Sequence, residues 1–386
     1  MKKRRLIWVV VGLTGLAVVT AIWWRSASAP TYQGRTITAW ALDMQHPSPE
    51  VRSNAEVALR VMGTDAVPSL VRSLNRRDIL PKGPFLSVAP KLPLWLRRFV
   101  VRHLNPFGAS QERLAAVSAM AVLGTNAPAE PLLRALHDPE RHIAAQAATA
   151  LGRMGAPAAA GLVRKLDDPD AYVRSMAIYA LSMMGPAASE AAPALIRRLK
   201  DSQPNIRAQA MYVLGRLGKA GLAALVGVLD TPDETLRVEV IQTLGKMRTQ
   251  ARDAAPALIE ATKDRAPAVR AAAVEALGVV WPISAESISA LRAALKDDVE
   301  EVRAKAAKSI GLASRLAGGA VPDLIAALED GDARVRAEAA RALGRIGSVA
   351  QLAAPRLREK LEDEDESVRT NALGALEIIE QSPPPD

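Results

Sequence analysis

The sequence predicts an all-α protein, a solenoid of about nine to ten stacked helix pairs that follows an N-terminal transmembrane helix. Three observations predict this architecture. A short phrase with an arginine near its start recurs at an almost constant spacing. A second phrase, rich in Ala and Leu, lies between the copies of the first. Both phrases carry apolar residues at helical spacing, and a long apolar run precedes them all.

The N-terminal segment, residues 1–30, predicts a membrane anchor. Leu6 to Trp24 is a run of 19 uncharged residues that follows a basic cluster at residues 2–5. As a helix this run would be about 28 Å long, close to the hydrocarbon thickness of a bilayer. The basic cluster should stay in the cytoplasm, with the two tryptophans that end the run at the opposite interface. We therefore expect a single-pass protein of the cytoplasmic membrane, with residues 31–386 in the periplasm or its extracytoplasmic equivalent.

A cleavable signal peptide is the alternative for the same segment. Ala27-Ser28-Ala29 resembles a cleavage site. The apolar run is longer than the usual signal-peptide core, which favours an anchor. Cleavage would give a secreted protein, so the body of the chain is exported in either case.

The first repeated phrase predicts one helix of each pair. In the copy YVRSMAIYALSMMG, Val173, Ala177, Ile178 and Leu181 cover one helical face. Weaker copies occupy residues 51–63, 114–124 and 143–155. The arginines of the clear copies follow one another at equal steps, except for a shorter step between the second and the third; they are Arg174, Arg207, Arg237, Arg270, Arg303, Arg336 and Arg369.

The second phrase predicts the other helix of each pair. Its copies AVPSLVRSL, AAPALIRRLKD, AAPALIEATKD, AVPDLIAALED and AAPRLREKLED begin at residues 66, 191, 254, 320 and 353. Proline near the start fits the first turn of a helix, where its missing N–H costs nothing. One helix pair cannot bury its apolar side alone, so neighbouring pairs must stack into a continuous core.

An aspartate stands six residues before most of the repeat arginines. We expect these acids in the turn between two helices, where they can cap the second helix or pair with the arginine of their own or the adjacent repeat. One exposed pair contributes little to stability, but a repeated ladder of pairs can fix the stacking register. The acids are Asp168, Asp201, Asp264, Asp297, Asp330 and Asp363.

The proline, the turn aspartate and the Val-Arg that opens the second helix resemble HEAT repeats, particularly the short HEAT-like repeats of phycobilin lyase subunits. The resemblance covers residues 37–380 approximately and implies a right-handed α-solenoid. Tyr32-x-Gly34-Arg35 and Trp40, after an apolar segment, are similar to bacterial exported HEAT-repeat proteins. Phycobilin lyase activity is not expected, because only the generic repeat matches. Fold alone does not specify a function.

The resemblance also implies that the second helix of each pair lines the concave surface. On that helix the fifth and ninth residues after each repeat arginine share a face away from the apolar stripe. This face is either a binding surface or an ordinary solvated helix face, with its tyrosines packed between repeats. We name the proposed binding surface the strip; its predicted residues are Tyr179, Met183, Tyr212, Arg216, Gln242, Lys246, Lys308, Arg341 and Arg345.

The strip predicts a protein or peptide partner. The full set of fifth and ninth positions holds two tyrosines and five bases against one acid, Glu275, and it also includes Val279 and Leu312, which are not counted in the strip. Tyr and Arg are common anchors of interfaces, and the basic excess favours an acidic or extended polypeptide.

Residues 78–110 interrupt the repeats with a segment rich in Pro, bases and aromatic residues. We predict either contact with an anionic membrane surface or a cap that folds over the first repeats. The residues proposed for this contact are Trp95, Arg97, Arg98, Phe99 and Arg102.

Composition excludes several classes of function. The formal net charge is +9, but residues 1–25 and 80–110 carry it, so nucleic acid is not an expected partner. The chain has no cysteine and four histidines, which excludes disulfides and thiolate metal sites. Phosphate-binding, dinucleotide-binding and hydrolase motifs are absent, so we expect no cofactor, no metal and no enzymatic activity.

We therefore predict a membrane-tethered scaffold that binds another protein through the concave surface of the solenoid. Two alternatives stay open: an accessory protein that holds a small ligand or chromophore in the concavity, as a lyase does, and an architectural element of the envelope.

Overall fold

The computed structural model describes residues 31–77, 90, 93 and 108–381. The predicted anchor at residues 6–24 and the proposed contact residues 95–102 lie outside the described residues. Within the described ranges, no helix is long and apolar enough to span a bilayer. The chain forms two compact units, one ending at Met184 and the other beginning at Gly185.

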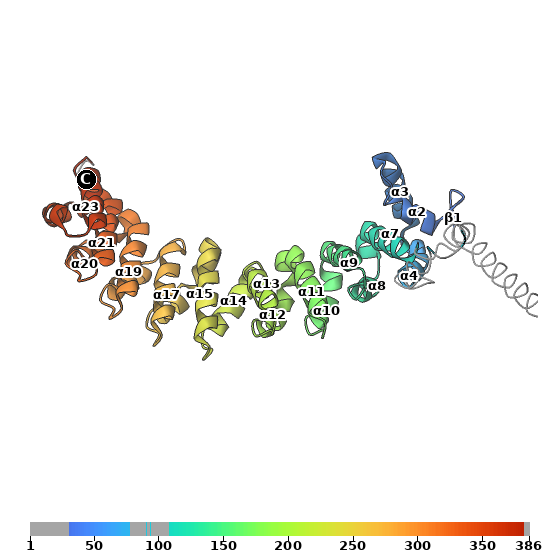
Figure 1. Cartoon of the computed structure of the whole chain (residues 1–386), viewed down its shortest axis with the longest axis horizontal. Coiled ribbons are helices and arrows are strands. Elements are labelled where there is room, and N and C mark those ends of the chain that lie inside the picture. Colours follow the sequence, from blue (N-terminus) through green and yellow to red (C-terminus); the bar gives the residue numbers. More distant parts are fainter. Residues whose placement is uncertain (1–30, 78–89, 91–92, 94–107, 382–386) are drawn as a thin grey trace, which may run out of the picture. The chain divides into compact units, whose positions relative to one another are not determined.

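Unit 1 holds four helix pairs within its described residues, and a short hairpin precedes them (Figure 1). We call the first helix of each pair the A helix and the second the B helix. The elements are β1 Thr31–Tyr32, β2 Arg35–Thr36, α2 Ile37–Asp43, α3 Pro49–Met62, η1 Gly63–Ala66, α4 Val67–Leu74, α7 Gly108–Leu123, η4 Gly124–Asn126, α8 Ala129–Ala135, α9 Arg141–Met154, α10 Ala156–Lys165 and α11 Ala171–Met184.

Unit 2 holds six helix pairs, with a 3-10 segment before most of the A helices. Its elements are η5 Gly185–Ala191, α12 Ala192–Arg198, α13 Pro204–Leu214, α14 Lys219–Val228, α15 Glu234–Met247, η6 Arg248–Ala254, α16 Ala255–Ala261, α17 Pro267–Val279, α18 Ala285–Ala294, α19 Glu300–Leu312, η7 Ser314–Ala320, α20 Val321–Ala327, α21 Ala333–Ile346, η8 Gly347–Ala353, α22 Ala354–Glu359, η9 Lys360–Glu362 and α23 Glu366–Gln381.

The repeated phrases form the helices that the sequence predicts. Proline lies in the first turn of A helices α4, α12, α16, α20 and α22. Successive B helices of unit 2 lie side by side in chain order from α15 to α23 (Figure 1). Their apolar stripes, made of residues such as Leu277, Ile310 and Leu343, are almost completely buried. The all-α solenoid prediction is therefore confirmed for the described residues.

The hairpin β1–β2 was not predicted. Its strands pair Thr31 with Thr36 and Tyr32 with Arg35, around a turn whose Gly34 has a φ of 73°. The indole Nε1 of Trp40 donates to the Tyr32 carbonyl at 3.0 Å, and the Arg35 guanidinium lies 4.3 Å from the Trp40 ring centroid. These contacts hold the hairpin against α2, which gives Tyr32, Gly34, Arg35 and Trp40 a structural role.

The predicted ladder of aspartates and arginines is present in unit 2, and Arg303 illustrates one rung. Its Nη1 donates to the carbonyl of Asp297, six residues earlier, at 2.9 Å. Its Nε and Nη2 donate to the carboxylate of Asp330, in the next repeat, at 2.7 and 2.9 Å. The same pattern joins Arg270 to Asp297 and Arg336 to Asp363. Each arginine therefore ties its own turn to the next repeat.

The capping role predicted for these aspartates is corrected. The Asp330 carboxylate accepts the backbone N–H of Asp332, which is itself the N-cap of α21. Asp264 and Asp297 bind the backbone N–H of N-cap residues Ala266 and Val299 in the same way. The ladder acid thus orders the turn that leads into the helix and leaves the N2 and N3 amides to other groups.

Ladder geometry also sets the charge state of its acids. Hydrogen bonds from Arg336 outweigh burial and lower the pKa of the Asp363 carboxyl below its ordinary value. The folded-state pKa is then lower than the unfolded one. This contribution to stability is therefore present above the unfolded pKa and is lost as the pH falls through the folded pKa.

Candidate functional site

One rung of the unit 2 ladder is missing, between α13 and α15. Thr231 occupies the position where other repeats have the aspartate, so it offers no carboxylate to Arg207. Arg207 keeps the hydrogen bond from Nη1 to the carbonyl of Asp201, at 2.9 Å. Among the described residues, no carboxylate pairs with its guanidinium. The same repeat contains the shorter step, from Arg207 to Arg237.

The short repeat changes how the helices connect. Residues 215–218 alone join α13 to α14, whereas the seven-residue η6 lies between α15 and α16. Helix α13 has 11 residues and α15 has 14. A groove of about 590 Å³ lies between these two B helices. It is lined from one side by Arg207, Met211, Tyr212 and Arg216 and from the other by Glu239, Gln242, Thr243, Lys246 and Met247.

The α13 wall of this groove presents an aromatic ring and a cation together. Tyr212 is 60% exposed, although it is a large ring on a helix that packs into a core. The Arg216 guanidinium carbon lies 5.5 Å from the Tyr212 ring centroid, and its Nη1 donates to the Tyr212 hydroxyl at 3.2 Å. The ring therefore positions the Arg216 charge at the mouth of the groove.

The groove carries an excess of positive charge. Arg207, Arg216 and Lys246 line it, and Glu239 is the acid on its wall. In the part of the chain that the structure describes, neither Arg216 nor Lys246 forms an ion pair. Met211 and Met247 supply apolar surface between these charges, and thioethers adapt readily to different partners. The arrangement suits a ligand that offers negative charge beside an apolar or aromatic group.

A second, smaller cavity of about 410 Å³ adjoins the first. It lies between α15 and α17 and shares Gln242 and Lys246 with the groove. Glu275 and Val279 complete its α17 wall. The B-helix face of unit 2 is therefore hollowed over two consecutive interfaces, with the Gln242–Lys246 pair between the hollows.

The other strip positions in the second unit line neither hollow. Lys308 lies 3.6 Å from Glu275, which Lys305 also contacts at 3.3 Å. Arg341 pairs with Glu338 at 3.1 Å. Arg345 is exposed on α21. Within unit 2, the strip residues that line the two hollows are Tyr212, Arg216, Gln242 and Lys246.

In unit 1, Tyr179 and Met183 lie on α11, 44% and 40% exposed. Tyr179 lines a cavity of about 480 Å³ together with His142, Gln146 and Arg153 of α9. Those α9 residues belong to the weaker copy of the repeat at residues 143–155. Ala144 replaces the arginine of that copy, and counting from it places Thr149 and Arg153 at the fifth and ninth positions.

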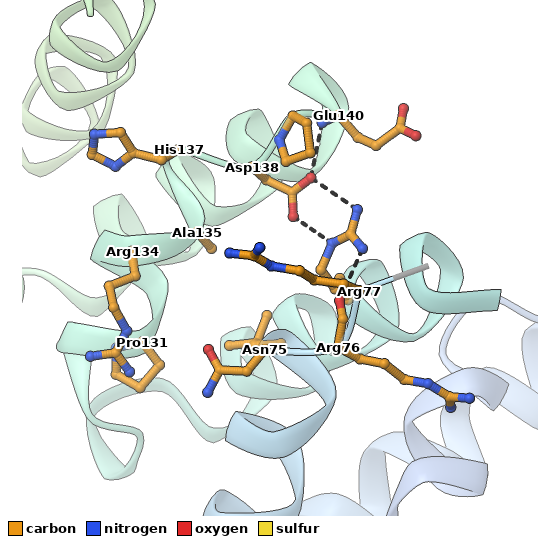
Figure 2. A pocket seen from close by; sticks show the side chains of 12 residues that line it. Asn75, Arg76, Arg77, Pro131, Arg134, Ala135, His137, Asp138 and Glu140 are labelled. Carbon is orange, nitrogen blue, oxygen red and sulfur yellow. Dashed lines mark hydrogen bonds and ion pairs between the residues drawn. The ribbon is translucent and has the colours of Figure 1, made fainter. Parts of the chain in front are cut away.

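Another cavity in unit 1, about 720 Å³, lies beside the turns that follow α4 and α8 (Figure 2). Its centre is a ladder rung. Arg113 donates to the Asp138 carboxylate from Nε at 2.6 Å and from Nη2 at 3.3 Å, and Asp138 also accepts the backbone N–H of Glu140. Arg76 pairs with Glu112. Because these charged groups are already engaged, we place the candidate site in the unit 2 groove.

Two charged residues of the groove were missed by the sequence analysis. Arg207 was assigned only to the ladder, although Thr231 and the shorter step to Arg237 both indicated that its rung is incomplete. Glu239 lies three positions before Gln242, on the same face of α15, and was left out of the count. Glu338 occupies the equivalent place on α21, so the face is less basic than predicted. No group of three or more His, Asp or Glu residues in the described ranges could hold a metal ion.

One solved structure with a TM-score of 0.50 agrees with this architecture at the level of fold. A mutant of the karyopherin Kap121p matches with a TM-score of 0.50 and 13% identity, over 91% of this chain and 42% of that one. Importin beta matches with a TM-score of 0.45 and 16% identity, over 89% and 55%. Human deoxyhypusine hydroxylase matches with a TM-score of 0.30 and 24% identity, over 66% and 96%. The chain spans about half the length, or less, of the karyopherins that it resembles.

The sequence itself matches no curated protein. The profile of HEAT repeats matches residues 108–182, 159–237, 222–311 and 288–377. Together these segments span residues 108–377, which is more than half of the chain. With the helix pairs and the ladder described above, this match shows that the chain belongs to the family of HEAT-repeat proteins.

Proposed function

We propose that the protein is a scaffold that binds an acidic, extended segment of a partner protein in the groove between α13 and α15. The missing rung carries this proposal. It leaves Arg207 beside Arg216 and Lys246, so three cations line one groove opposite a single acid. Arg207 is half-buried and has no carboxylate partner among the described residues, so a carboxylate from a ligand would offset the cost of burying its charge.

The shape of the face favours an extended segment. The two adjoining hollows share Gln242 and Lys246, so an extended ligand can fill both hollows at once. The Gln242 side chain can both donate and accept hydrogen bonds, which suits the backbone of an extended chain. A compact small molecule would use only one hollow and leave the other cations solvated.

Charge reversal in the groove tests the proposal. The probe is a short fluorescent peptide of alternating Glu and Ser, titrated with the full chain and followed by fluorescence anisotropy. We expect Arg216→Glu and Lys246→Glu each to weaken binding roughly tenfold, because an attractive charge becomes repulsive. Binding should also weaken as salt rises, since exposed charges are screened.

The matched control is Arg252→Glu, an exposed arginine of η6 that lines neither hollow. It changes the net charge by the same amount and should leave the affinity nearly unchanged. A counterpart peptide with Lys in place of Glu should not bind. Equal losses in all three variants would mean that only the net charge matters, and the groove would be rejected as the site.

We further propose that this scaffold is tethered to the outer side of the cytoplasmic membrane by residues 6–24. The uncharged run over these residues and the basic cluster before it support the tether. In membrane fractions of cells that express the full chain, we expect the protein to resist extraction at high pH and to keep its N-terminal residues. Release into the soluble fraction with cleavage near Ala29 would contradict the tether and establish secretion.

A further inference from the structure

The outer face of α23 leaves a core position uncovered. In the four B helices that precede it, the residue four places after the repeat arginine is completely buried; these residues are Ile241, Val274, Ala307 and Ala340. In α23 the same position is Leu373, and this side chain is 52% exposed. A large apolar residue therefore lies exposed on the face that the four preceding repeats cover with their successors.

Arg369 on the same face has an incomplete rung. Its Nη1 donates to the carbonyls of Asp363 and Glu364 at 2.8 and 3.0 Å, as in other repeats. In Arg270, Arg303 and Arg336, Nε and Nη2 bind an aspartate of the following repeat. Within the described residues, no carboxylate contacts Nε or Nη2 of Arg369. These two N–H groups can therefore donate hydrogen bonds to a carboxylate from outside the described residues.

Glu377 shows that a further repeat in the same register is not the occupant. The residue eight places after the arginine is glycine in α15, α17, α19 and α21, where the next B helix approaches closely. A Cβ at Gly344, for example, would lie 3.0 Å from the Cα of Ala375. In α23 this position is Glu377, which is exposed. Its side chain keeps any incoming helix one side-chain layer further away.

These three residues are self-complementary. Arg369, Leu373 and Glu377 follow one another at steps of four and so form one row along the helix surface. If a second α23 packs antiparallel across a two-fold axis at Leu373, the residue four places before the axis faces the residue four places after it. Arg369 of one copy then meets Glu377 of the other, twice, around a pair of leucines. Such an isologous contact is closed, as most homo-oligomer interfaces are.

We propose that the α23 face is a homodimer interface, in which Glu377 of a second copy supplies the carboxylate that Arg369 lacks. The contact covers Leu373 in both copies and completes both rungs. The face is only one helix pair wide, which places it at the small end of specific interfaces, so we expect a dissociation constant in the micromolar range. The α13–α15 groove is not part of this contact.

Charge swapping tests the dimer. The full chain is studied in detergent micelles, because residues 6–24 are apolar, and its mass is followed by sedimentation equilibrium over a range of concentrations. We expect Glu377→Arg to raise the dissociation constant of the dimer at least about tenfold. In each half of the dimer, the new arginine at position 377 would face Arg369 of the other copy and repel it. Combining Arg369→Glu with Glu377→Arg restores opposite charges and should restore dimerisation. Failure of the double variant to dimerise, with its helicity intact, would overturn the charge pairing.

Cross-linking provides a second readout that does not depend on charge. The chain contains no cysteine, so Leu373→Cys introduces a single thiol on the proposed axis. We expect mild oxidation to give a covalent dimer. The control is Leu316→Cys on η7, which is 60% exposed but off this face. Equal cross-linking of both variants, or none at Leu373→Cys, would show that α23 does not face itself and would reject the proposal.

Discussion

Replacing Gly221 with alanine should destabilise unit 2 by about 3 kcal/mol or more. Gly221 lies in α14, and a Cβ there would overlap the carbonyl oxygen of Leu214, in the last turn of α13. Residues 215–218 alone join these two helices, so α14 cannot move away without pulling on α13. The clash is with backbone, which cannot relax by a change of rotamer. Denaturant unfolding of the full chain, followed by circular dichroism, measures the effect.

Gly227→Ala is the matched control, in the same helix. Nothing lies within 4 Å of a Cβ at Gly227. Alanine is favoured over glycine in a helix interior by roughly 0.5–1 kcal/mol, so this variant should be slightly more stable than the parent. If both variants behaved alike, helix propensity would decide the outcome, and the close approach of α14 to α13 would be wrong.

Removing a ladder acid should have a similarly large effect, while removing its neighbour should not. Asp297 and Asp298 both bind Arg270, at 2.7 and 2.6 Å. The Asp297 side chain is 11% exposed and that of Asp298 is 84% exposed. Asp297→Ala leaves a half-buried guanidinium without its main partner and also frees the turn N–H of Val299. We expect a loss of about 3 kcal/mol in the free energy of unfolding.

Asp298→Ala removes the same charge from the same arginine. Because its carboxylate is exposed to water and ions, we expect a loss of no more than about 0.5 kcal/mol. The two values come from the same unfolding experiment on the full chain. A similar cost for both would mean that burial does not control the strength of these pairs, and the ladder would lose its role in fixing the register.

Most of the fold could be predicted from the sequence, because each signal for a helix or a turn recurs in many repeats. The regular spacing of the arginines, the proline of the A helix and the acid six residues before each arginine all predicted what the described residues contain. The direction of the ladder was harder to predict. Asp330 binds its own turn and the preceding repeat together, and only the three-dimensional stack places Arg303 within reach of it.

The candidate site was predictable only in part. Tyr212, Arg216, Gln242 and Lys246 were expected on one face, and they line adjoining hollows. The hollows themselves depend on the distance between helices, which residue spacing on one helix does not contain. Some of the predicted cations are also paired in the fold, since Lys308 and Arg341 have acidic neighbours on the same face. Counting bases along a strip could not distinguish those paired cations from Arg216 and Lys246.

Thr231 gives the missing rung a meaning that depends on the regularity of the other repeats. In a regular repeat array each unit contacts only its neighbours, so identical interfaces have the same internal contacts and offer a partner nothing distinctive. Losing one carboxylate at a single position converts a cation that served the stack into one that can serve a ligand. In such a protein, the absence of one ladder carboxylate can create a binding specificity, while the intact rungs on neighbouring repeats keep the fold stable.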